Sequence, residues 1–411
     1  MEENKKQNLF FNIIIFIVVF IVCLLGVELF LHKIKPQQDE YILDQKLKVV
    51  GNPASGRDKN GYRNYSVPGQ VDVVAIGDSQ TDGYLNAKKI EDSWPHALGT
   101  LLEKDVYQVA LAGYGPVQYN FLLKQALDFN PQTIVVGFYL GNDLFDVFDM
   151  VYQGESWIEL RDKNFSFKEP IDVNITDENF VSLKYAYKKG SLQFKIMEAR
   201  QWLRQNSFIF SFLSDITVGV RDKFGLADTK EKREQRLDGF AQENQDLLFF
   251  YNQEPKTTLS PYYRTSVIDL DDKRIEEAFR ITQQLFLEMN NVLKTKGKKF
   301  IVVIIPTKEL VYGRYMNYVG MEYSTQLADY LKKEERLVNQ IIDFCKTNQI
   351  DCVEPADDLV VGLKDKKEIY PADIDGHPTA EGYKVIAESV FKYWQQKNNT
   401  TTEIVSGDQK K

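Results

Sequence analysis

Short apolar runs rich in β-forming residues alternate with longer amphipathic stretches, and this alternation constrains the fold more than any other feature. β-strands are predicted at Val71–Ile76, Tyr107–Leu111, Thr133–Tyr139, Lys299–Ile305 and Ile350–Val353. Helices are predicted at Trp94–Glu103, Gln118–Phe129, Lys273–Lys296, Gln326–Thr347 and Thr379–Gln396. Because parallel strands need long crossover connections, the pattern predicts an α/β fold with helices on both faces of a parallel sheet.

A long segment between the third and fourth predicted strands interrupts this alternation. We interpret residues 144–271 as a large, mostly helical insertion, with helix-like pieces at Leu183–Leu203 and Lys230–Phe250. The sheet domain would then span residues 71–397. A polar linker rich in Gly and Pro precedes it at 32–70, and a polar tail at 398–411, which we expect to be disordered, follows it.

The N-terminal segment Leu9–Leu31 is almost wholly apolar. About 23 residues at ~1.5 Å each span roughly 34 Å, which is enough to cross a bilayer core. The segment lacks the small residues of a signal-peptide cleavage site, so we predict a retained single-pass membrane anchor. Lys5 and Lys6 precede the segment while Lys33 and Lys35 follow it, so the charges do not decide its orientation.

Composition excludes several other classes of function. Lys and Arg total 51 against 59 Asp and Glu, and no basic stripe is interleaved with aromatics, so nucleic acid is not an expected partner. Cys23 lies in the anchor; Cys345 and Cys352 could pair, but we interpret both as small buried apolar residues. Neither a clustered His/Cys site nor a nucleotide motif is present, so no metal and no cofactor are predicted.

A serine follows the first predicted strand in the tight turn Gly77-Asp78-Ser79-Gln80. Ligands of parallel α/β sheets bind beyond the carboxyl ends of the strands, so the Ser79 hydroxyl would face a substrate, the alternative being a helix cap. A serine nucleophile needs a general base. Among the three histidines, His32 lies at the membrane boundary and His96 on a predicted helix, which favours His377.

Two further requirements of nucleophilic catalysis have candidates at the ends of predicted strands or beside His377. Asp373 and Asp375 both lie close enough to orient the imidazole. Gly113 follows the second strand and Asn142 the third, and their backbone or side-chain N–H groups would suit an oxyanion hole. Each is an ordinary turn residue alone, but successive parallel strands place them at one edge of the sheet.

Together these four blocks resemble, in order and spacing, the sequence blocks of SGNH/GDSL hydrolases, over Val71 to Trp394 apart from the insertion. The resemblance implies a flavodoxin-like three-layer α/β/α sandwich with Ser79 and His377 as the catalytic pair. It also implies oxyanion donors from Ser79 N–H, Gly113 N–H and the Asn142 side chain. Ile374 occupies the family's usual acid position, so we take Asp375 as the triad acid and Asp373 as the second choice.

The function implied is serine-dependent hydrolysis of an acylated glycan or lipid at the membrane surface, by an extracytoplasmic domain. An O-acetyltransferase acting on a cell-surface polysaccharide would use the same residues, and the chain also resembles the periplasmic alginate O-acetyltransferase proteins. The alternative of another class is a catalytically inactive, membrane-tethered glycan-binding protein. Substrate contacts are conceivable for Lys308 or Arg314 with an anionic group, and for Phe145 or Phe148 with an acyl chain, although plain packing explains these residues equally well.

Overall fold

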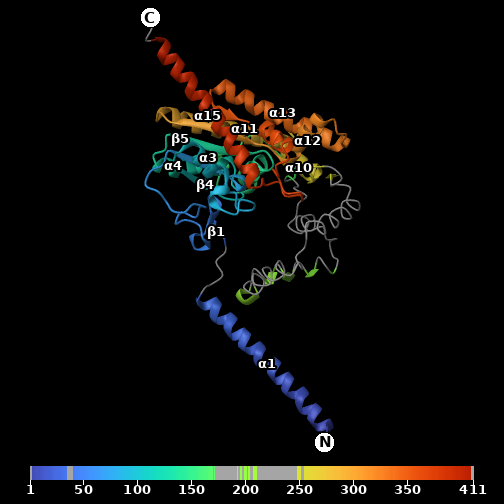
Figure 1. The fold of residues 1–411 in the computed structure, drawn as a ribbon. Helices are drawn as coiled ribbons and strands as arrows, with labels where there is room; N and C mark the ends of the chain where they lie inside the picture. The colour runs from blue at the N-terminus through green and yellow to red at the C-terminus, as the bar shows by residue number, and fades with distance from the viewer. Residues whose placement is uncertain are drawn as a thin grey trace. The chain divides into compact units, whose positions relative to one another are not determined.

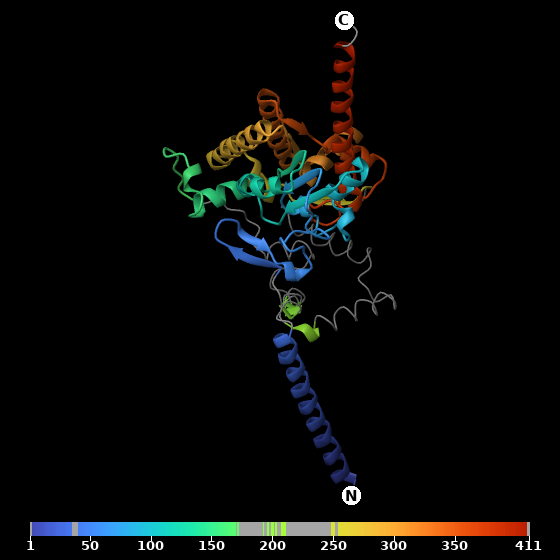
Figure 2. The ribbon, with the colours of Figure 1, turned by 90° about the vertical axis from the view of Figure 1, so that its left-hand side faces the viewer.

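A computed structural model describes residues 2–34, 40–169, 171, 192, 195–196, 199–200, 202–203, 207–210, 248–250 and 254–408 (Figures 1 and 2). The chain forms two compact units, residues 1–40 with 185–240 and residues 41–184 with 241–411. The larger unit carries the sheet domain. The predicted helices Leu183–Leu203 and Lys230–Phe250 fall largely outside the described residues.

The larger unit is built on a five-stranded parallel sheet (Figure 1). Its strands are β3 (Val73–Gly77), β4 (Val106–Ala110), β5 (Thr133–Tyr139), β8 (Lys299–Ile305) and β9 (Asp351–Val353). They follow the order β4-β3-β5-β8-β9, which is a flavodoxin-like order. The strands lie within two residues of their predicted positions, and β3 and β5 are buried throughout because helices cover both faces.

Helices form the two outer layers. Within the sheet, β4 lies on one side of β3 and β5 lies on the other, so the two connections run across the sheet in opposite directions. Because both crossovers are right-handed, α3 (Trp94–Leu102) and α4 (Pro116–Asp128) cover opposite faces. α15 (Ala380–Asp408) packs against α3, and α11 (Lys273–Thr295) packs against α4. The remaining described elements of this unit include the helices α5 (Asp143–Phe148), α10 (Pro261–Ile268), α12 (Lys308–Val319), α13 (Thr325–Asn348) and α14 (Ala356–Lys364), and the antiparallel strands β6 (Leu248–Phe250) and β7 (Thr257–Leu259). The expected α/β sandwich is confirmed.

Part of the expected linker folds onto the sheet domain. β1 (Tyr41–Asp44) and β2 (Lys48–Gly51) form an antiparallel hairpin, and a 3₁₀ turn follows at Pro53–Ser55. Further along, Arg57 forms a buried ion pair with Asp82 at 3.0 Å. The Gly and Pro residues of this segment therefore lie in the turns of a short folded structure, and the segment is not a free tether.

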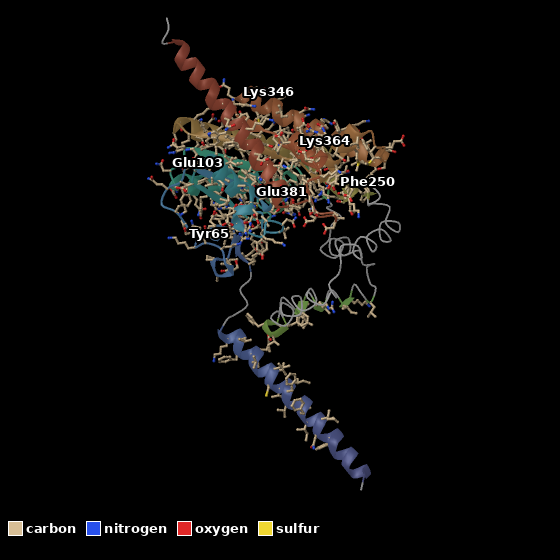
Figure 3. All side chains as sticks on the ribbon, viewed as in Figure 1. Tyr65, Glu103, Phe250, Lys346, Lys364 and Glu381 are labelled. Carbon is tan, nitrogen blue, oxygen red and sulfur yellow. A yellow bond between two sulfur atoms is a disulfide. The ribbon has the colours of Figure 1, made fainter. Side chains whose placement is uncertain are left out.

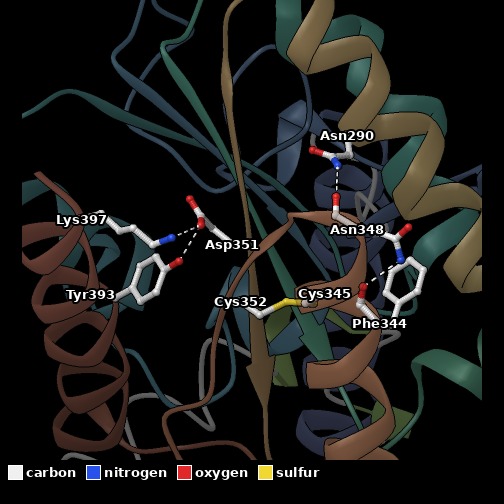
Figure 4. The surroundings of a disulfide bond; sticks show 8 residues. All are labelled: Asn290, Phe344, Cys345, Asn348, Asp351, Cys352, Tyr393 and Lys397. Carbon is white, nitrogen blue, oxygen red and sulfur yellow. Dashed lines mark hydrogen bonds and ion pairs between the residues drawn. A yellow bond between two sulfur atoms is a disulfide. The ribbon is translucent and has the colours of Figure 1, made fainter. Parts of the chain in front are cut away.

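Cys345 and Cys352 form a disulfide, so the interpretation of two unpaired buried residues was wrong (Figure 4). α13 ends at Asn348, and Gln349, with φ 54°, reverses the chain directly into β9. This turn brings the two Cα atoms within 6.2 Å, inside the range that a disulfide spans. Disulfides persist mainly in oxidising compartments.

The C-terminal tail also differs from expectation. α15 continues through Asp408, whereas residues 398–411 had been predicted to be disordered. The chain contains no proline after Pro378, and after Gly382 no glycine until Gly407, so nothing in the sequence stops the helix earlier. The extension was not predicted because the sequence of residues 398–411 has no apolar periodicity.

The smaller unit contains α1 (Glu2–Ile34), which includes 21 residues from Phe11 to Leu31 with a mean hydropathy of 3.2. This helix is long and apolar enough to span a membrane. Glu28, which lies within this apolar stretch, accepts hydrogen bonds from Phe208 N at 2.7 Å and Ile209 N at 3.0 Å. The charge within the apolar run is therefore satisfied by the backbone of a second segment.

Candidate active site

The candidate site lies where the direction of strand addition reverses. β3 pairs with β4 on one side and β5 on the other, so the carboxyl ends of β3 and β5 flank the topological switch point, where open α/β sheets bind ligands. Ser79 begins the short helix α2 (Ser79–Asp82) directly after β3. Gly77 permits this turn because a Cβ there would lie 2.0 Å from Thr81 Oγ1. Asp78 caps α2 by accepting a hydrogen bond from Gln80 N at 2.9 Å.

Ser79, His377 and Asp375 form a continuous hydrogen-bonded series. Ser79 Oγ lies 2.9 Å from His377 Nε2, and His377 Nδ1 lies 2.7 Å from Asp375 Oδ1. The same carboxylate oxygen accepts a hydrogen bond from His377 N at 3.0 Å. Asp373 instead accepts one from Asp375 N at 3.0 Å. The geometry therefore places Asp375 against the imidazole and Asp373 one step behind it.

Two cations, the buried Lys308 and the partly buried Arg264, lie beside the loop that carries Asp375. Lys308, fully buried, donates hydrogen bonds to the carbonyl oxygens of Pro371, at 2.6 Å, and Asp373. Burial lowers the pKa of its ammonium to about 8. The guanidinium of Arg264 lies behind the loop, because a Cβ on Gly376 would lie 2.9 Å from Arg264 Nη2.

The structure does not support a substrate-binding interpretation of either cation after β8. Lys308 points into the protein, as described above. Arg314 forms ion pairs with Glu335 at 2.8 Å and with Glu354 at 2.9 Å. Sequence alone could not reveal that both charges are satisfied internally, because their partners lie 21 to 65 residues away.

The expected oxyanion donors lie on the loops after β4 and β5. Gly113 has φ +78°, a conformation that favours glycine, and an added Cβ would meet nothing within 4 Å. Asn142 lies at the start of α5 and donates through Nδ2 to Asp146 Oδ2 at 2.9 Å. Its Oδ1 is buried and has no hydrogen-bond partner among the described residues. α2 packs against both β4 and β5, so all of these residues lie at one edge of the sheet.

Three carboxyl groups surround this edge: Asp78, Asp143 and Asp146. Burial raises the pKa of Asp78 to about 7, although the N–H of Gln80 and the charge of His377 act in the opposite direction. Burial, followed by repulsion from Asp78, also holds the pKa values of Asp143 and Asp146 well above their usual range. Sequence reasoning missed Asp146, although its spacing of four residues from Asn142 at a helix start was the available signal.

Other residues considered from the sequence have structural partners. His96 lies 3.0 Å from Ser93 Oγ, and burial lowers the pKa of its imidazole to about 4, so it is not positioned as the base for Ser79. Phe148 is fully buried and stacks on Tyr152 with ring centroids 5.0 Å apart. Phe145 is partly buried against the same core. Phe148 therefore serves packing and does not face a substrate.

Comparison with family models and with curated proteins gives no match. Among solved structures, the chain is similar to a GDSL-like lipase from Bacteroides thetaiotaomicron, at 10% identity over 79% of this chain and 88% of that one, with a TM-score of 0.34. It is also similar to phospholipase A1 from Streptomyces albidoflavus, at 9% identity over 80% and 99% of the chains, with a TM-score of 0.34. An extracellular lipase from Streptomyces rimosus matches at 9% identity over 79% and 98%, with a TM-score of 0.33.

Proposed function

We propose that this chain is a serine esterase of the SGNH/GDSL kind that cleaves acyl esters through an acyl-enzyme on Ser79. The observation that carries the proposal is the series Ser79–His377–Asp375, with contacts of 2.9 and 2.7 Å, at the switch point of a flavodoxin-like sheet. A serine is a weak nucleophile unless a base accepts its proton, and a base needs an orienting acid. All three requirements are met by side chains already in contact.

The reaction begins when Ser79 Oγ attacks the ester carbonyl while His377 Nε2 accepts its proton. Asp375 stabilises the imidazolium and holds its Nδ1–H. The backbone N–H groups of Ser79 and Gly113 and the amide of Asn142 stabilise the oxyanion. His377 then protonates the departing alkoxide. Water, activated by the same imidazole, releases the acid and regenerates Ser79.

The proposed setting is the outer surface of a membrane, with an acylated glycan or lipid as substrate. α1 supports an anchor, since it is long and apolar enough to cross a bilayer. The Cys345–Cys352 disulfide supports an oxidising, extracytoplasmic compartment.

Turnover of a model acetyl ester tests the proposal. Ser79→Ala should reduce kcat by at least about three orders of magnitude, because binding and oxyanion effects alone remain. Ser389→Ala is the control. The buried Ser389 hydroxyl on α15 donates to Asp358 Oδ2 on α14 at 2.7 Å, and its loss should leave kcat within about twofold. Ester turnover that survives Ser79→Ala would refute the mechanism.

Adding a sugar acceptor to the same assay separates hydrolysis from transfer. An O-acetyltransferase would form acylated sugar at the expense of free acetate, and this product would also disappear in Ser79→Ala. A wild-type protein that turns over no ester and acylates no sugar would favour the glycan-binding alternative.

A further inference from the structure

The hairpin β1–β2 and the segment beside its turn carry exposed apolar side chains. Ile42 and Leu43 are consecutive in β1, so they lie on opposite faces of the two-stranded ribbon. Ile42 and Leu43 in β1 are 47% and 88% exposed. Trp157 lies against the hairpin turn, donating from Nε1 to Lys46 O at 3.0 Å, and its ring lies 5.5 Å from that of Phe121. The neighbouring Ile158 is 59% exposed. We call the set Ile42, Leu43, Phe121, Trp157 and Ile158 the hairpin patch.

Several contacts hold this hairpin in place. Asp44 Oδ1 accepts hydrogen bonds from Lys46 N at 2.8 Å and Leu47 N at 2.7 Å, which fixes the turn. Ser156 Oγ donates to Gln45 O at 2.8 Å. The exposed side chains are therefore presented by an ordered ribbon, and their exposure is not a consequence of a loose end.

The hairpin is also joined to the loops of the candidate site. Tyr114, which follows Gly113, donates from its hydroxyl to Val49 O at 3.0 Å. Lys48 pairs with Asp149, just beyond α5. A surface that binds the hairpin patch would therefore lie next to the loops after β4 and β5, at the edge of the sheet that carries Ser79.

Chain connectivity limits what the hairpin can reach. α1 ends at Ile34 and β1 begins at Tyr41. The seven Cα–Cα steps from Ile34 to Tyr41, fully extended, cover at most ~25 Å. A membrane crossed by α1 is consequently always within this distance of the start of the hairpin, whichever way the sheet domain turns.

We propose that the hairpin patch docks onto the lipid surface and inserts into the boundary between headgroups and acyl chains. The inference rests on the proposed anchoring of α1. Aliphatic side chains enter such a boundary to about 5–10 Å, while Trp and Lys favour the headgroup level, as Trp157 and Lys46 would here. Docking would turn the edge that carries Ser79 toward substrates held in or near the bilayer.

A single exposed aliphatic residue elsewhere in the sheet domain supplies a matched control. Val361 on α14, the helix that ends at Lys364 (Figure 3), is 49% exposed, against 47% for Ile42. It lies more than three hundred residues along the chain from the anchor, so the short connection that holds Ile42 near a membrane does not hold Val361 there. Non-specific adsorption of exposed aliphatic residues to lipid would give the same quenching at both positions.

The test uses the full-length chain in phosphatidylcholine vesicles with Cys23→Ala and the disulfide left oxidised. A single cysteine replaces Ile42, Leu43 or Val361 and carries an environment-sensitive fluorophore. Vesicle flotation first measures anchoring, and brominated phosphatidylcholine then measures contact with acyl chains. We expect a blue-shifted emission and at least about threefold stronger quenching at positions 42 and 43 than at 361, because bromine quenches only at contact depth in the bilayer.

Equal, weak quenching at all three positions in protein that floats with the vesicles would overturn the docking and leave the anchor standing. A blue shift at 42 and 43 without bromine quenching would also overturn it, since protein would then cover the patch. If the protein fails to float with the vesicles, both the proposed anchoring by α1 and the proposed docking are refuted. Ester turnover by Ser79 is measured separately in detergent and is decided by none of these results.

Discussion

Replacing Asp375 by Asn should disable the enzyme, whereas the same replacement at Asp373 should not. The two carboxylates make a matched pair, because they are 4% and 5% exposed and lie two residues apart on one loop. Asp375 contacts the imidazole, with Oδ1 2.7 Å from His377 Nδ1. Asp373 Oδ1 accepts a hydrogen bond from Asp375 N, and an Asn amide oxygen can accept the same bond.

The magnitude follows from the charge that each change removes. Asp375→Asn keeps the shape of the side chain but loses the charge that stabilises imidazolium, which costs about 10⁴ in kcat in comparable triads, or ~5.5 kcal/mol of transition-state stabilisation. Asp373→Asn leaves the hydrogen bond to Asp375 N in place and removes a charge that acts on the buried Lys308 ammonium, not on the imidazole, so we expect kcat to fall by less than about tenfold.

The assay compares kcat for a model acetyl ester across wild type, Asp375→Asn and Asp373→Asn, with circular dichroism to confirm that each variant is folded. A crippled Asp373→Asn beside a nearly normal Asp375→Asn would refute the assignment of the acid. If both variants keep most of their activity, His377 acts without a carboxylate partner, and the triad reasoning fails.

Two further predictions follow from the buried carboxyls and the anchor. Burial raises the pKa of Asp78 from 3.8 to about 7, so the folded state binds one more proton than the unfolded chain between these values, and Asp78 alone should lower the free energy of unfolding by up to ~4 kcal/mol as pH rises from 4 to 8. Urea unfolding at pH 5 and pH 8 measures this fall, which Asp78→Asn should reduce; an unchanged fall in that variant would assign it to other groups. Deleting residues 1–35 should give a water-soluble protein with unchanged kcat, because the hairpin and sheet begin at Tyr41; an aggregated or inactive product, judged by gel filtration and ester turnover, would contradict this.

The sequence predicted the sheet well because its strands are continuous buried runs. Lys299–Ile305 and Thr133–Tyr139 match β8 and β5 residue for residue. The hairpin β1–β2 was missed because its strands have four residues each and expose Ile42 and Leu43, so no alternating pattern marks them.

The candidate site was predictable where its residues lie beside strand ends. Ser79, Gly113 and Asn142 follow successive strands, and topology brings such positions to one edge. The roles of buried charges were not predictable. For Lys308 the sequence left substrate contact and plain packing equally open, because its partners, the carbonyl oxygens of Pro371 and Asp373, lie 63 and 65 residues away. The pairing of Cys345 with Cys352 likewise depends on the reversal at Gln349, which local pattern does not show.

The most direct test of the account is covalent labelling with a fluorophosphonate probe followed by peptide mass mapping. An activated serine attacks the phosphorus, displaces fluoride and retains the phosphonyl group, whereas an unactivated hydroxyl reacts slowly. We predict stoichiometric labelling of Ser79 in the wild-type protein, none in Ser79→Ala, and labelling slowed by at least about 10³ in His377→Ala because its general base is absent. Labelling elsewhere, or a wild-type protein that stays unlabelled while folded, would contradict the claim that Ser79 is an activated nucleophile.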